Sequence, residues 1–293
     1  MVTPKQALLG ALALVAIVFT IFWWKLARRH RSEHGGATVG GTAIGFITNF
    51  FDTLGIGSFA TTTSIYRGWR LVADEKVPGT LNVGHAWPTF VQAFIYTQLV
   101  EVEFNTLILL ILAAVAGSWI GAGIVSGLPK RNIQIGMGVA LLVAAVLMVL
   151  TALNRMPGGG DALALRGAKL QVAIVINFIL GALMTLGIGA YAPIMIMISL
   201  MGMNPTAAFP IMMGSCALLM PTASAQFIRR EKYDLRAAIG LAIGGIPAVV
   251  IAAYLVKSLP LAYVRWLVVV VVVYTGVALI RASRPSQQTA PTA

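Results

Sequence analysis

Two short glycine motifs are the clearest candidates for chemistry in this sequence. Gly55-Ile56-Gly57 and Gly187-Ile188-Gly189 each interrupt an apolar stretch that is too long for one straight membrane span. Glycine permits a tight reversal or an unwound segment, and the N–H groups at a helix start can bind an anion without a basic side chain. We therefore expect an anion site at these turns, with Ser58, Thr61 and Tyr191 beside them. The alternative is that the glycines only allow helices to pack closely.

Polar residues at the start of two later apolar runs could also contact a ligand. Thr80 and Asn82 open one run, and Ser215 lies near the start of the other. Their hydroxyl and amide groups could hydrogen-bond a ligand oxygen, or could join helices instead. His85 lies one helical turn beyond Asn82 and has the same two interpretations, a place in the site or a structural role.

Asp52 is the only carboxylate embedded in a membrane segment. A buried acid costs several kcal/mol unless it is paired or protonated. Asp52 could therefore cap the turn that it precedes, or it could titrate and couple transport to protons. The matching position in the second half of the chain is Met184, so the repeated fold does not require an acid there.

The remaining residues predict no metal site, no cofactor and no enzymatic activity. The chain has three histidines (His30, His34 and His85), one cysteine and nine acidic residues. His30 and His34 are four residues apart but have no further ligand nearby, so we interpret them as loop residues. Cys216 cannot form a disulfide within the chain, and we expect it to be a packing residue.

The composition predicts an integral membrane protein in contact with the lipid bilayer. Of 293 residues, 58% are apolar and 10% are charged, whereas soluble domains average about 45–50% apolar and about 25% charged. The length allows about nine or ten membrane segments of roughly 20 residues each. The net charge of +12 comes from basic clusters between the apolar runs, which is typical of cytoplasmic loops. We therefore expect no nucleic-acid partner.

The chain contains an internal repeat with an offset of 131 or 132 residues. The sequence from Thr53 to Gly57 recurs from Thr185 to Gly189, and Pro78 matches Pro210. Two-fold repeats of this kind build many secondary transporters. We divide the chain into an N-terminal helix with a basic loop (1–34), a first repeat (38–153), a linker (154–169), a second repeat (170–282) and a polar tail (283–293). The first helix is interpreted as retained rather than as a signal peptide.

Loop charges favour inverted repeats over parallel repeats. If each broken stretch enters and returns on one side, 15 Lys and Arg residues lie inside and 6 outside. If it crosses, the count is 13 inside and 8 outside. The first distribution fits the positive-inside rule better. It predicts three spanning helices per repeat, an outside N-terminus, a cytoplasmic C-terminus, and two glycine turns that face each other near the middle of the membrane.

The glycine turns at 54–58 and 186–190, Pro193, and the helix starts at 77–82 and 209–215 together resemble the TauE/SafE family. This family of sulfite and organosulfonate permeases is also called TSUP. The resemblance covers about residues 38–280. It implies an all-α, inverted-repeat carrier for small sulfur-containing or organic anions in a prokaryotic inner membrane. The sequence departs from the family pattern in its first turn, which has fewer glycines and has Thr61 where the second half has Pro193.

We therefore expect a secondary transporter for a small anion, with sulfite, sulfonates or related oxyanions favoured and protons as a candidate coupling ion. No phosphate-binding loop for ATP is present. An anion channel using the same site is the alternative, followed by a non-transporting membrane subunit. A homo-oligomer is compatible with the sequence.

Overall fold

The computed structural model describes residues 4–34, 36–54, 56–187, 191–255 and 262–283. Within these ranges the chain forms helices and no strand. The helices are α1 (Pro4–His34), α2 (Val39–Thr53), α3 (Ser58–Gly68), η1 (Asp74–Lys76), α4 (Val77–Leu99), α5 (Phe104–Val125), α6 (Lys130–Ala152), α7 (Gly167–Met184), α8 (Tyr191–Leu200), η2 (Pro205–Ala207), α9 (Ala208–Arg229), α10 (Leu235–Leu255) and α11 (Ala262–Ala282).

The predicted all-α polytopic membrane protein is confirmed. Among the described residues, six helices are long and apolar enough to cross a membrane, namely α1, α5, α6, α7, α9 and α10. The shorter apolar stretch Val268–Ala282 of α11 comes in addition to these six. The helices α2, α3 and α8 have only 15, 11 and 10 residues, and α4 carries a row of buried polar side chains.

The order of helices in residues 39–152 recurs in residues 167–282. Each series has one helix, a shorter helix, a 3-10 turn and three longer helices. The first helix of each series packs on the second of the three longer helices of the other, so α2 lies against α10 and α7 against α5. At the centre α4 packs on α9, and α6 packs on α11. The two series are therefore interlocked rather than side by side.

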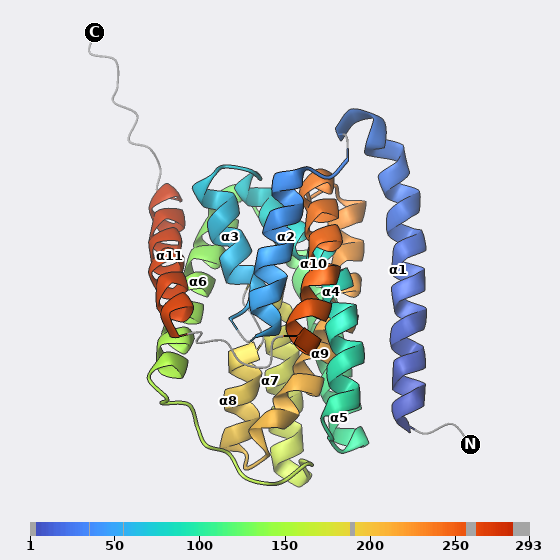
Figure 1. Cartoon of the computed structure of the whole chain (residues 1–293), viewed down its shortest axis with the longest axis vertical. Helices are drawn as coiled ribbons and strands as arrows, with labels where there is room; N and C mark the ends of the chain where they lie inside the picture. Colours follow the sequence, from blue (N-terminus) through green and yellow to red (C-terminus); the bar gives the residue numbers. More distant parts are fainter. Residues whose placement is uncertain (1–3, 35, 55, 188–190, 256–261, 284–293) are drawn as a thin grey trace.

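The α2–α3 pair and the α7–α8 pair enter the bundle from opposite ends. In Figure 1, α2 and α3 occupy the upper part of the molecule, whereas α7 and α8 occupy the lower part. Eleven residues of α3 extend only about 16 Å, against about 30 Å for a hydrocarbon core. The chain thus reverses its direction inside the bundle between the end of α2 and the start of α3. Whether these pairs belong to two homologous, inverted repeats stays a prediction.

Glycines allow the closest contacts between the two series. A Cβ on Gly244 of α10 would lie 1.9 Å from the carbonyl oxygen of Thr42 on α2. A Cβ on Gly117 of α5 would lie 1.9 Å from the carbonyl oxygen of Phe178 on α7. No side chain fits at such distances, so these helices cross with their backbones in contact. At these two crossings, glycine is therefore needed for close packing of the helices.

Side-chain caps fix the start of α2 and of α5. The Thr38 hydroxyl accepts the N–H of Gly41 over 3.0 Å. The Glu103 carboxylate accepts the N–H of Thr106 over 2.7 Å, and this bond holds the pKa of Glu103 below its ordinary value. Caps of this kind satisfy N–H groups that a helix start leaves free.

Candidate functional site

The turn between α2 and α3 depends on Gly57. Its φ is +89°, which side chains rarely adopt, and it immediately precedes Ser58, the first residue of α3. A Cβ built on Gly57 would meet no atom within 4 Å. The backbone angle, rather than crowding, therefore requires glycine here. The predicted site residue Gly55 lies outside the described residues.

Asp52 caps the start of α3. Its Oδ1 accepts the backbone N–H of Ser58 over 2.6 Å, and its Oδ2 accepts a hydrogen bond from Gln92 Nε2 over 2.9 Å. The capping role considered for Asp52 is thus present in the structure. An N–H group at the predicted anion site is bound by a carboxylate of the protein itself. The coupling role of Asp52 stays a prediction.

The predicted residues Ser58 and Thr61 lie at the same helix start. Ser58 is buried. The Thr61 hydroxyl lies 3.0 Å from the carbonyl oxygen of Gly57 and 2.9 Å from that of Ser58. The structure therefore brings Asp52, Gly57, Ser58 and Thr61 together on one short segment.

His85 is held from both sides by residues of the α2–α3 pair. It is fully buried, with Nδ1 2.9 Å from Asn49 Oδ1 and Nε2 3.1 Å from Thr62 Oγ1. Asn49 donates through Nδ2 to the carbonyl oxygen of Gly45, so its Oδ1 acts as the acceptor. The neutral tautomer with a proton on Nδ1 satisfies both contacts. Both ring nitrogens of His85 are thus used inside the protein.

A polar face of α4 binds the α2–α3 pair, and most of it was missed from the sequence. Gln92 Nε2 donates to Thr53 Oγ1 over 3.0 Å, and the Tyr96 hydroxyl donates to the carbonyl oxygen of Thr53 over 2.9 Å. Together with Asn82, His85 and Thr89, these residues recur every three or four positions, which places them on one helix face. That spacing was the available indication. The spacing alone does not identify the partners Asn49 and Thr62, because these depend on how α2 and α3 pack against α4.

Thr80 and Asn82 lie at the start of α4, away from the α2–α3 turn. The Thr80 hydroxyl donates to the carbonyl oxygen of Lys76 and accepts the N–H of Asp234, each over 2.8 Å. It therefore joins α4 to the loop before α10. Asn82 Nδ2 donates to the carbonyl oxygen of Pro78, and its Oδ1 is buried without a protein partner among the described residues. Their contact with substrate stays a prediction.

The second turn reaches a different level of α4. Gly187 has a φ of +102°, and a Cβ on it would lie 3.8 Å from Leu81 Cδ1. Leu81 and Gln92 are 11 residues apart on α4, or about 16 Å. The end of α2 and the end of α7 thus pass each other along α4. That the two glycine turns face each other near the middle of the membrane stays a prediction.

The other predicted residues of the second half are only partly described. Gly189 lies outside the described residues, and Tyr191 begins α8 but its side chain is not described. Ser215 is fully buried, with its Oγ 3.4 Å from Asn177 Nδ2 of α7. Cys216 Sγ lies 3.5 Å from Met184 Sδ, in the same contact between α7 and α9. No group of three or more metal-ligating side chains occurs within the described ranges.

Comparison with known proteins gives one informative finding. The family model described as Sulfite exporter TauE/SafE matches residues 2–148, half of the chain. The matched part contains α2, α3, α4 and the whole α2–α3 turn. No curated protein and no solved structure matches the sequence.

Proposed function

Because the chain belongs to the TauE/SafE family, as the match over residues 2–148 shows, we propose that it is a secondary transporter for a small anion. The family supports a membrane permease for sulfur compounds, and sulfite, organosulfonates and related oxyanions are the favoured substrates. We place the protein in a prokaryotic inner membrane, with inverted repeats. The observation that supports the site most strongly is the start of α3, inside the bundle, where Asp52 binds the N–H of Ser58.

The substrate anion takes the place of the Asp52 carboxylate in this proposal. The N–H of Ser58 and the side-chain amide of Gln92 both donate to Asp52. A helix start with a free N–H and an amide donor suits an oxyanion, which offers several acceptor oxygens. Two negative charges at these donors would repel each other strongly in a buried site.

Protonation of Asp52 resolves this conflict. A neutral carboxyl group releases the two donors and can itself donate to the bound anion. One proton then moves with each anion, and the pair carries less net charge through the apolar interior than the anion alone. We propose that proton movement and anion transport are coupled because the anion and the ionised Asp52 carboxylate compete for the same donors at the start of α3.

Counterflow in proteoliposomes tests the function. Vesicles loaded with unlabelled sulfite should take up labelled sulfite faster than empty vesicles, and the rate should saturate. Linear flux without counterflow acceleration would indicate the alternative, an anion channel. Absence of flux for sulfite, sulfate and organosulfonates would contradict the proposed function and leave a non-transporting membrane subunit.

Two glycine variants test the site. Gly57→Val places a branched side chain at a φ of +89° beside the proposed anion position, whereas Gly167→Val does the same at a φ of +56° at the start of α7. Neither Cβ meets an atom within 4 Å. Gly57→Val should abolish counterflow and sulfite-induced thermal stabilisation, and Gly167→Val should retain both. Equal activity of the two variants would reject the α3 site.

A further inference from the structure

A basic cavity lies at the opposite end of α3 from the proposed substrate site. Its volume is about 640 Å³. Its charged lining consists of Arg67, Arg70, Lys130 and Asp74, and Tyr274 and Thr275 of α11 form part of its wall. Three cations thus face one carboxylate around a space large enough for several water molecules or a small anion. The charge distribution of the sequence predicts that this end of the molecule is cytoplasmic.

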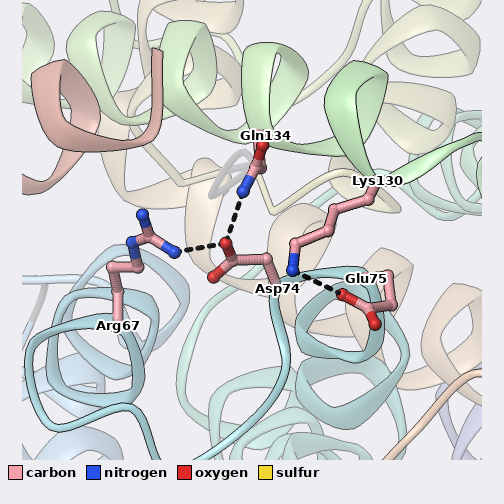
Figure 2. Close-up of polar contacts among 5 residues, drawn as sticks. All are labelled: Arg67, Asp74, Glu75, Lys130 and Gln134. Carbon is pink, nitrogen blue, oxygen red and sulfur yellow. Dashed lines mark hydrogen bonds and ion pairs between the residues drawn. The ribbon is translucent and has the colours of Figure 1, made fainter. Parts of the chain in front are cut away.

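The carboxylate that lines this cavity, Asp74, already has a cation as its partner, as Figure 2 shows. Asp74 is 5% exposed. Arg67 Nη1 donates to its Oδ2, and Gln134 Nε2 donates to the same oxygen over 2.7 Å. Arg67 and Asp74 therefore form a pair that joins α3 to η1, with α6 attached through Gln134. The positive charge left to the cavity comes from Arg70 and Lys130.

Lys130 is only weakly held. Its Nζ lies 3.8 Å from Glu75 Oε2, and its side chain is 60% exposed. At 3.8 Å the two groups form no hydrogen bond, and Glu75 Oε2 is buried without a hydrogen-bond partner among the described residues, so only the attraction of the two charges holds Lys130 here. The exposed ammonium can exchange this contact for another. The ammonium of Lys130 can therefore turn to an anion in the cavity without breaking a strong contact.

Arg70 occupies a backbone position that favours glycine. Its φ is +52°, and α3 ends with hydrogen bonds from Arg70 N–H to Arg67 O and from Leu71 N–H to Tyr66 O. This is a Schellman ending with Arg70 as the left-handed residue.

The end of α8 has the same geometry with glycine in place of arginine. Gly202, with a φ of +87°, donates to Ser199 O, and Met203 donates to Ile198 O. Gly202 follows Arg70 by the 132 residues of the internal repeat. The fold thus accepts glycine at this ending, and the backbone gives no reason for arginine. The guanidinium of Arg70 lines the cavity.

We propose that this cavity is a second anion site, which binds an oxyanion group between Arg70 and Lys130. The proposal rests on the proposed transport function, because it places a collecting site about 16 Å along α3 from the substrate site. A guanidinium and an ammonium form charge-assisted hydrogen bonds with sulfite, sulfate or phosphate oxygens. The oxyanion can be a free solute or the phosphate of a lipid headgroup, and the chemistry is the same.

The test compares two proteins. One is a double variant that carries both Arg70→Gly and Lys130→Gln, and the other is the control variant Arg236→Gln. Arg70→Gly suits the backbone of the Schellman ending, and Lys130 is exposed, so the double variant should fold. Arg236 is exposed on α10 at the same end of the molecule and does not line the cavity. All variants also carry Gly57→Val, which removes the proposed substrate site.

The first arm measures sulfate and sulfite affinity in phosphatidylcholine vesicles at low ionic strength. If the site takes a free ion, the double variant binds about tenfold more weakly than the Arg236→Gln control, as expected for lost charged hydrogen bonds. The second arm replaces part of the lipid with phosphatidylglycerol and measures thermal unfolding without added oxyanion. A lipid-phosphate site appears as stabilisation of the control that the double variant lacks.

Equal affinity and equal stabilisation of the two proteins in both arms would overturn the proposal. The result is independent of the substrate site, because binding is measured in the Gly57→Val background. Loss of transport in the parent protein with intact cavity binding would count against the proposed function and not against this second site. Intact transport with no cavity binding would count against the second site alone.

Discussion

Gln92 Nε2 donates a 2.9 Å hydrogen bond to Asp52 Oδ2 and ties the second half of α4 to the end of α2. The same amide nitrogen also donates to Thr53 Oγ1. The carboxylate at the α3 start is therefore oriented by a helix from outside the α2–α3 pair. Protonation of Asp52 would weaken this hydrogen bond and with it a contact between the α2–α3 pair and α4.

Asp52→Asn should uncouple transport from the proton gradient. Asparagine caps helices about as well as aspartate, so the variant should fold and bind substrate. It cannot take up or release a proton. With one proton per anion, a gradient of about one pH unit supports about tenfold accumulation, which the variant should lose while it retains exchange. Uptake into proteoliposomes with and without a pH gradient measures both quantities.

Asp161→Asn is the matched control for this measurement. Asp161 is exposed in the connection before α7, so its substitution should leave gradient-driven accumulation at the wild-type level. Wild-type accumulation by Asp52→Asn would reject the coupling role and leave Asp52 as a cap.

His85→Ala should destabilise the protein by about 2–4 kcal/mol. The substitution removes a buried ring and leaves Asn49 Oδ1 and Thr62 Oγ1 without their partner. Unsatisfied buried polar groups cost about 1–3 kcal/mol each. Thr89→Val, on the same helix, removes only a bond to the carbonyl oxygen of His85 and should cost much less. Thermal unfolding in detergent compares them, and a smaller loss for His85→Ala than for Thr89→Val would contradict the structural role.

Gly117→Ala and Gly123→Ala should have opposite effects, although both lie on α5. The added Cβ at position 117 would lie 1.9 Å from Phe178 O, whereas the one at position 123 would meet nothing closer than 3.9 Å. Overpacking costs about 1–3 kcal/mol, and alanine in place of an unconstrained helical glycine gains up to about 1 kcal/mol. Unfolding temperatures should therefore fall for Gly117→Ala and rise slightly for Gly123→Ala. A neutral Gly117→Ala would mean that α5 and α7 are not in backbone contact.

Cysteine labelling should place the two ends of the bundle on opposite sides of the membrane. In a Cys216→Ala background, Glu101→Cys should react with an impermeant maleimide from outside, and Lys232→Cys only after the cells are permeabilised. The prediction rests on the distribution of Lys and Arg. Reaction of both positions from the same side would reject inverted repeats.

The fold was predictable from the sequence where glycines interrupt apolar runs. The expected break at 55–57 separates α2 from α3, and the one at 187–189 separates α7 from α8. A cap at Asp52 was one of the two roles that the same local pattern left open, and the structure contains it. These features depend on residues close together in the chain, which is why a single sequence contains them.

The partners of the site were not predictable in the same way. Gln92 lies 40 residues from Asp52, and Asp234 lies 154 residues from Thr80. Which face of α4 meets α2, and how far α7 reaches along α4, depends on the packing of whole helices. Nor does the local sequence reveal that Arg70 and Gly202 end their helices in the same way, because arginine is not a residue that a left-handed helix ending favours.

The interlocking of α2 with α10 has a consequence for synthesis of the protein. Roughly 200 residues separate these two helices, and ribosomes add about 5–20 residues per second. The α2–α3 pair therefore waits roughly 10–40 s in the membrane before α10 emerges to cover it. During that interval Gly41 and Gly45 expose backbone that α10 later contacts. We expect lipid or the insertion machinery to cover this glycine surface until α10 has been made.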